Sequence, residues 1–194
     1  MSQPQSTLVV RLWSHLRSLR SRVYVRLARA SGSELATEIF LGRGCEVDLG
    51  MDDARRGNVR IGKETTLVRD VIIHPYGGHV HIGARAHLGP GTVIYGQGGV
   101  EIGDDCLIGM HCRILSSNHD IPPVNRRIRW EKDVLKPTRI GNDVWLGAGV
   151  TVLGGITLGD GCVIGAGAVV TNDIPPGAIA YGTPARVVGQ RPLS

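Results

Sequence analysis

The sequence predicts an all-β protein, a parallel β-helix built from a six-residue repeat, preceded by a short amphipathic helix and interrupted by one protruding loop. Glycine is abundant, with 28 residues of 194, while aromatic residues make up only 4%. This composition suits many tight turns rather than a core packed around Phe and Trp. Aliphatic residues recur at a fixed interval of six, which matches neither the 3.6-residue period of a helix nor simple strand alternation.

The repeat unit is a large aliphatic residue followed by glycine. It occurs at Ile82-Gly83, Leu88-Gly89, Ile102-Gly103, Ile108-Gly109, Ile140-Gly141, Leu146-Gly147, Leu158-Gly159 and Ile164-Gly165. A second position, two residues before each aliphatic, holds small or β-branched residues, such as Val80, Cys106 and Ala168. We expect both positions to point inward, with a short strand and a corner in each unit.

Every third corner lacks the glycine, which indicates that three units make one triangular coil. Tyr95, Leu115, Leu153 and Thr171 stand at these corners. Ile61, Leu67 and Ile73 give an earlier coil of the same phase, and Leu41 and Val47 suggest a degenerate first one. Stacked coils bury a continuous core and pair their backbones with the coils above and below. At the remaining corners we expect the glycine to permit the turn.

The segment IGNDVWLGAGVTVLGGITLGDGCVIGAGAVVTNDIPPGAIAYGTPARVVG, residues 140–189, resembles the hexapeptide-repeat acyltransferases. The likeness extends over roughly residues 58–188 and is greatest to the galactoside/maltose O-acetyltransferase branch and its polysaccharide O-acetyltransferase relatives. The resemblance implies a left-handed coil and a homotrimer. It also implies an acyl-CoA-dependent enzyme that moves an acetyl group from acetyl-CoA to a hydroxyl of a sugar or glycan precursor in a ternary complex. No metal is expected.

The domain organisation follows from the repeat. Residues 1–35 form a basic helical segment, residues 36–188 the β-helix acyltransferase domain, and residues 189–194 a C-terminal tail. The phase breaks between Ile114 and Ile140, and the excess chain predicts a loop at residues 116–137. A long loop in a tightly repeating solenoid is usually functional.

His119 lies at the start of this loop, just past a coil corner. The resemblance implies that a His in this place is the general base. An unperturbed imidazole has a pKa of about 6.5, so its neutral form is available to take a hydroxyl proton. Asn118 and Asp120 are candidates to orient the ring, although polar side chains are equally expected there on a loop that faces solvent. Cys106, Cys112 and Cys162 occupy the small inward position, so we expect them to pack in the core rather than carry an acyl group.

The resemblance also implies a set of acetyl-CoA contacts in a groove between two subunits of a trimer. The predicted cofactor-binding residues are Gly147, Ala148, Ala166, Thr171, Asn172 and Arg186. Repeat structure alone explains the small residues among them, whereas Arg186 has no packing reason to be there. On the acceptor side, Gly89 and Gln97 stand where the galactoside enzymes carry substrate-contacting Asn and Asp, so the galactoside specificity does not carry over.

The net charge of +5 arises from the basic residues of the N-terminal segment. Residues 1–30 hold six arginines and no acid, while the rest of the chain has 16 basic and 17 acidic residues. This distribution argues against a nucleic-acid partner. An apolar stripe through residues 8–30, flanked by arginines, predicts a helix. Three interpretations stay open: peripheral contact with an anionic membrane, packing on the β-helix or a neighbouring subunit, or disorder of the segment. No apolar run approaches the roughly 20 residues of a membrane span, so a cytoplasmic location is expected, with the inner membrane face as the peripheral site.

Two rival functions remain. The same scaffold hosts γ-class carbonic anhydrases, which hold zinc through three histidines across a subunit interface. His74 and His79 have an H-x4-H spacing, with His81, His87 and His111 nearby, but in the anhydrases such a pair comes last, and His81 and His87 are expected on different faces of the coil. The second rival is a non-catalytic β-helix scaffold.

Overall fold

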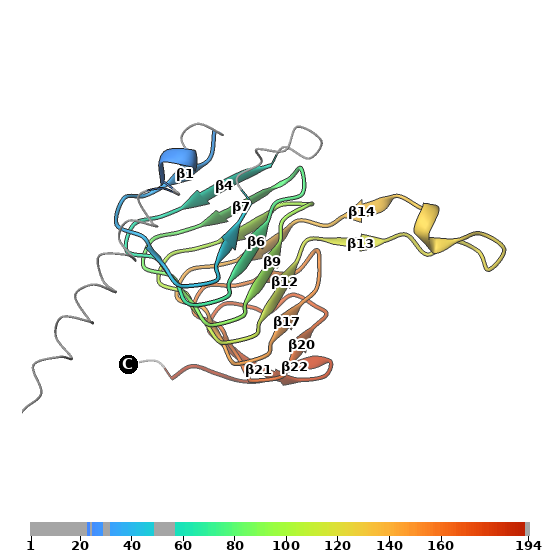
Figure 1. The fold of residues 1–194 in the computed structure, drawn as a ribbon. Helices are drawn as coiled ribbons and strands as arrows, with labels where there is room; N and C mark the ends of the chain where they lie inside the picture. The colour runs from blue at the N-terminus through green and yellow to red at the C-terminus, as the bar shows by residue number, and fades with distance from the viewer. Residues whose placement is uncertain (1–22, 24, 29–31, 49–56, 193–194) are drawn as a thin grey trace, which may run out of the picture.

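The computed structural model describes residues 23, 25–28, 32–48 and 57–192. Within them the chain coils into a three-sided stack of short strands (Figure 1). Each side is a sheet in which strands from successive coils pair in parallel, except for the final antiparallel pair. The predicted fold class, a parallel β-helix of hexapeptide repeats, is confirmed.

The three sheets are named A, B and C in the order in which the chain visits them. Sheet A contains β1 (Glu34–Leu35), β4 (Asn58–Ile61), β7 (His79–Ile82), β10 (Val100–Ile102), β15 (Thr138–Ile140) and β18 (Thr157–Leu158). Sheet B contains β2 (Phe40–Leu41), β5 (Thr66–Leu67), β8 (His87–Leu88), β11 (Leu107–Ile108), β16 (Trp145–Leu146), β19 (Val163–Ile164), β21 (Ala178–Gly182) and β22 (Ala185–Gln190). Sheet C contains β3 (Glu46–Val47), β6 (Ile72–His74), β9 (Val93–Tyr95), β12 (Arg113–Leu115), β17 (Thr151–Val152) and β20 (Val169–Val170).

The core consists of columns of like residues, one from each coil. On sheet B the register aligns Leu88, Ile108, Leu146 and Ile164, all of them fully buried. The small position is buried as well, including all four cysteines. Because every inward residue meets its counterpart on the next coil, the repeat phase alone sets the packing. The predicted core positions are confirmed.

The glycine after each aliphatic residue has a different role from the one expected. A Cβ added at Gly109 would lie 2.7 Å from the backbone of Gly147 and Ala148 on the next coil, closer than packed atoms approach. The left-handed backbone that a tight corner needs falls two residues later, at His111 (φ 56°). The expectation that this glycine permits the turn was therefore wrong at such corners; glycine is needed because successive coils stack backbone against backbone.

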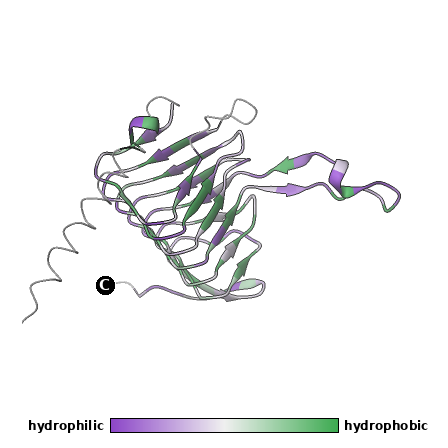
Figure 2. Cartoon of the chain, viewed as in Figure 1, coloured by the Kyte–Doolittle hydropathy of each residue, from purple (hydrophilic) through white to green (hydrophobic). Residues whose placement is uncertain are grey.

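The break in the repeat is a two-stranded hairpin, called the arm (residues 116–137), which projects from the stack in Figure 1. It comprises β13 (Ser117–His119), the 3-10 helix η2 (Ile128–Trp130) and β14 (Asp133–Leu135). The backbone N–H of Lys136 donates to Ser116 O (2.8 Å) and closes the base. Figure 2 shows β13 as hydrophilic and β14 as largely hydrophobic.

Only the end of the predicted N-terminal helix belongs to the described residues. Residues 23 and 25–28 are helical, and the stripe over residues 8–22 lies outside the described part of the chain. Val25 and Ala28 pack into the core, whereas Val23 and Leu27 are exposed. Val23 and Leu27 belong to the predicted apolar stripe, so the face that packs in the described part of the helix is not that stripe. Among the described residues there is no helix of the length and apolarity that a membrane span requires.

Candidate active site

The arm pairs His119 with an acidic residue that lies fourteen positions away in the sequence. In the antiparallel register of β13 and β14, His119 stands opposite Asp133. His119 Nδ1 lies 2.7 Å from Asp133 Oδ1. A neutral imidazole that donates its Nδ1–H to a carboxylate keeps its lone pair on Nε2. The pair therefore has the arrangement of an oriented general base.

Asp133 is itself held by a second side chain. Gln97 donates through Nε2 to Asp133 Oδ2 (2.7 Å), and Ser117 Oγ donates to Gln97 Oε1 (3.1 Å). Both carboxylate oxygens of Asp133 thus have a partner, which fixes the plane of the group that His119 contacts. Gln97, expected on the acceptor side of the site, is in contact with Asp133 and also lines the cleft beside it.

The cleft has a volume of about 630 Å³, within the usual range for small-molecule sites. Its wall consists of Tyr76, Tyr95, Gln97, Leu115, Ser117, Asn118, His119 and Asp133. The rings of Tyr76 and Tyr95 meet edge to face, with centroids 5.0 Å apart. The cleft thus combines an aromatic wall, a set of polar groups and a base.

The sequence interpretation singled out His119 but not Asp133, which the structure places beside it. Of the two residues considered as ring-orienting partners, Asp120 accepts from the backbone N–H of Ile121 (2.9 Å). Asn118 lines the cleft and pairs with Val134 across the hairpin. The signal that points to this part of the sequence is the hairpin, since a loop that leaves and re-enters one coil must run antiparallel and bring its two ends together. The register that places Asp133 opposite His119 is not contained in that signal.

The predicted acetyl-CoA contacts lie at more than one place. Ala148 and Ala166 are exposed on successive coils at the corner between sheets B and C. Gly147 is buried, and its N–H donates to Ile164 O (2.8 Å). At the opposite edge of sheet C, Thr171 Oγ1 donates to Asn172 Oδ1 (3.0 Å).

Arg186 is exposed on β22, where its Nη1 donates to Ala185 O (3.0 Å). His119 follows β12 at the same edge of sheet C as Thr171. Ala148 and Ala166 of one chain thus lie across sheet C from His119 of that chain.

The cysteines fit no covalent role. Burial raises the pKa of Cys106 to about 11 and that of Cys162 to about 12, and it raises the pKa of Cys112. Cys106 and Cys112 donate to the carbonyls of Gly141 (3.1 Å) and Gly147 (3.2 Å) on the next coil. A protonated, buried thiol is a poor nucleophile.

The histidines of the zinc alternative are dispersed. His74 contacts Glu46 on sheet C (Nε2–Oε1 2.9 Å), whereas His79 lies on sheet A and His87 on sheet B. The H-x4-H pair is therefore split between two sides of the prism. Within the described ranges, one set of three or more His, Cys, Asp and Glu side chains lies close enough together to hold a metal ion. It consists of His79, His81 and Glu101.

Comparison with known proteins supports the predicted fold and family. Two family models match: "Bacterial transferase hexapeptide (six repeats)" over residues 137–172 and "Hexapeptide repeat of succinyl-transferase" over residues 79–112. Nodulation protein L of Rhizobium leguminosarum bv. viciae is 37% identical over 147 residues, which cover 76% of this chain and 75% of that protein. The chain belongs to the left-handed β-helix, hexapeptide-repeat acetyltransferases, in the branch that contains the galactoside O-acetyltransferases.

Solved structures agree. A galactoside acetyltransferase in complex with coenzyme A is 34% identical, with a TM-score of 0.62 over 67% of this chain and 64% of that one. The polySia specific acetyltransferase NeuO is 27% identical, with a TM-score of 0.65 over 81% and 71%. The chain spans only about half to three fifths of the length of several curated relatives.

Proposed function

We propose that this protein is an acetyl-CoA-dependent O-acetyltransferase whose acceptor is a hydroxyl of a sugar or glycan precursor. The observation that carries the proposal is the His119–Asp133 pair (Nδ1–Oδ1 2.7 Å) in the wall of a cleft. Family membership supports the choice of donor, since a related galactoside acetyltransferase binds coenzyme A.

The reaction is direct transfer in a ternary complex. The Nε2 lone pair of His119 takes the proton of the acceptor hydroxyl while its oxygen attacks the thioester carbonyl. A backbone N–H stabilises the oxyanion of the tetrahedral intermediate. As the carbon–sulfur bond breaks, the imidazolium returns the proton to the departing sulfur, which leaves free coenzyme A and an acetyl ester. Asp133 stabilises the imidazolium between these two steps.

The composition of the cleft supports a sugar acceptor. Tyr76 and Tyr95 offer aromatic surface, on which the C–H face of a sugar ring can stack, and Ser117 and Asn118 offer polar groups to its hydroxyls. Such a mixture of aromatic area and a few polar groups is typical of small-molecule sites.

The site is completed by a second copy of the chain in a homotrimer. The separation of Ala148 and Ala166 from His119 across sheet C supports this part of the proposal. A donor lying along the Ala148–Ala166 corner of one subunit reaches the His119 of a neighbour when the two prisms pack side by side. Arg186, Thr171 and Asn172 are the further donor contacts that the family resemblance implies.

The test is an acceptor screen with acetyl-CoA, in which coenzyme A release is followed chromatographically for the full chain. His119→Ala should abolish acceptor-dependent release. His87→Ala is the matched control, because His87 is an exposed histidine on sheet B, outside the cleft. Equal acceptor-dependent rates for the wild type and His119→Ala would contradict the mechanism. No release with any acceptor would favour the non-catalytic scaffold.

The N-terminal segment is the remaining part of the proposal. A cytoplasmic enzyme with residues 8–30 against the inner membrane face would meet lipid-linked glycans, and the exposure of Val23 and Leu27 is compatible with that contact. The alternative was packing on the β-helix or on a neighbouring subunit, and the burial of Val25 and Ala28 in the core of the same chain supports packing on the β-helix. Deletion of residues 1–30 followed by liposome co-sedimentation distinguishes these two interpretations. If the segment contacts the membrane, the shortened chain should no longer sediment with liposomes.

A further inference from the structure

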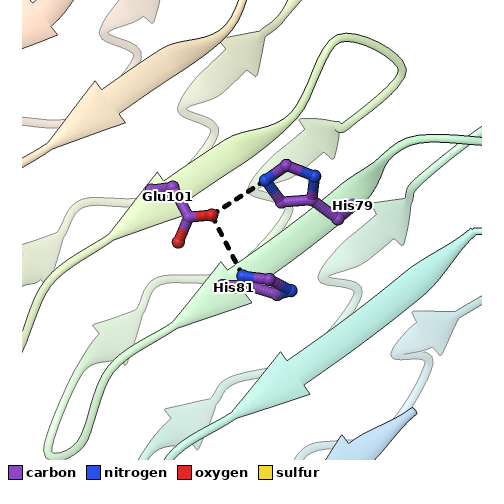
Figure 3. Close-up of side chains that lie close together, drawn as sticks. All are labelled: His79, His81 and Glu101. Atoms are coloured by element: carbon purple, nitrogen blue, oxygen red, sulfur yellow. Dashed lines mark ion pairs between the residues drawn. The ribbon is translucent and has the colours of Figure 1, made fainter. Parts of the chain in front are cut away.

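Sheet A carries a cluster of two histidines and a glutamate on its outer face, remote from the arm. His79 and His81 alternate with the buried Val80 and Ile82 on β7, so both imidazoles leave the same side of the strand. Glu101 lies opposite His81 on the next coil. Figure 3 shows the three side chains converging above the sheet. This cluster and the His119 cleft share no residue.

The ligand atoms already face one point. His79 Nε2 lies 2.8 Å and His81 Nδ1 3.0 Å from the same oxygen, Glu101 Oε1. The three atoms lie within 4.8 Å of one another. Two imidazole nitrogens and one carboxylate form a ligand set that zinc takes in open sites and that other first-row metals also accept.

A second contact defines the tautomer of His81. Asn58 donates through Nδ2 to Gly32 O (2.7 Å), so its Oδ1 faces His81 Nε2 at 3.0 Å. His81 therefore carries its hydrogen on Nε2, and the Nδ1 of the neutral ring presents a lone pair to the carboxylate oxygen of Glu101. Two acceptors at 3.0 Å repel unless a cation lies between them.

The cation between His81 Nδ1 and Glu101 Oε1 is either a proton or a metal ion. A metal ion there can also bind His79 Nε2, which lies 2.8 Å from the same carboxylate oxygen. A carbonyl oxygen that fixes the free nitrogen of a metal-binding imidazole is also the usual outer partner of such a ligand.

We propose that His79 Nε2, His81 Nδ1 and Glu101 bind one divalent transition-metal ion per chain, zinc being the probe ion. All three side chains are partly exposed, with 39%, 26% and 46% of the surface of each open. A fourth position is therefore open to water or to a ligand from outside the chain. This departs from the expectation of no metal, and it assigns the ion a site separate from the acetyl-transfer chemistry.

The test is zinc binding by the full, tag-free chain, with equilibrium dialysis at micromolar zinc followed by elemental analysis. The wild type should bind one zinc per chain. His81→Asn and Glu101→Gln should each bind at least about 10-fold more weakly, as loss of a ligand predicts. His87→Asn, which removes an exposed histidine of sheet B outside the cluster, should bind like the wild type.

Thermal unfolding provides a second measurement that does not depend on activity. Zinc should raise the Tm of the wild type and of His87→Asn, because an ion that binds only the folded state stabilises it. It should leave Glu101→Gln unchanged. Wild-type binding no tighter than that of the His79→Asn/His81→Asn double variant would overturn the proposal and leave a proton as the cation between His81 and Glu101.

Discussion

Replacing Asp133 by Asn removes the negative charge beside the proposed base, His119, and keeps the shape of the side chain at position 133. In the proposed mechanism, the Asp133 carboxylate stabilises the imidazolium that forms on His119 when the acceptor proton is taken. At the 2.7 Å separation of Nδ1 and Oδ1, two unit charges in a water-like dielectric attract by about 1.5 kcal/mol. The water-like value applies because 72% of the His119 side chain and 33% of that of Asp133 are exposed.

Since 1.4 kcal/mol corresponds to a factor of ten in rate, we expect kcat to fall about 10-fold in Asp133→Asn. The KM for acetyl-CoA should stay the same, because Asp133 acts through His119 and not on the donor. A merely structural defect would change both constants together with the Tm. The assay is initial-rate coenzyme A release at saturating acceptor.

Asp120→Asn is the matched control. It neutralises the acid next to His119 in the sequence, but its carboxylate contacts the backbone of Ile121, so kcat should remain within about two-fold of the wild-type value. If Asp120→Asn lowers kcat as much as Asp133→Asn, or if Asp133→Asn has no effect, the assignment of Asp133 as the positioning residue is wrong.

Three further predictions concern the solenoid. Leu146→Ala, fully buried, should lower the free energy of unfolding in urea by about 2–5 kcal/mol, whereas Leu107→Ala, 48% exposed, should cost less than about 1 kcal/mol; equal losses would contradict the inward phase. Gly109→Ala should cost at least about 1–3 kcal/mol because its Cβ meets the next coil, while Gly189→Ala, with no neighbour within 4 Å, should be nearly neutral by the same measurement. Stability should fall as the pH rises from 9 toward 11, since the pKa of Cys106 is raised from 9.0 to about 11 and the unfolded chain loses that proton first. Cys106→Ala should flatten this fall in urea titrations at several pH values, and an unchanged slope would refute the reasoning.

The repeat phase is the part of the molecule that the sequence predicts best. One aliphatic every six residues is enough to place Ile108, Leu146 and their counterparts inside, because each coil copies the one below. The break in the six-residue phase likewise predicted the position of the arm, with His119 at its start. The role of glycine could not be read in this way, since a turn and a close approach between coils both select Gly, and only the stacking distance at Gly109 separates them.

Contacts that depend on how inserted residues are accommodated were not predictable from the sequence. Asp133 lies opposite His119 only because the hairpin has one particular register. Glu101 lies opposite His81, 20 residues earlier in the chain, although a regular coil takes 18. The extra residues fall at a corner, where they leave the strand register intact, and a sequence pattern does not show which corner absorbs them.

The arm leaves the solenoid and returns to it within a single coil. Ser116 and Lys136 close its base, and Thr138 then pairs with Val100 in the ordinary register. The coil beneath is thus complete whatever lies beyond the base. The tip of the arm can lengthen, shorten or change in composition during evolution while the stack keeps its stability. No residue of the tip lines the cleft, so such changes leave the His119–Asp133 pair at the root in place.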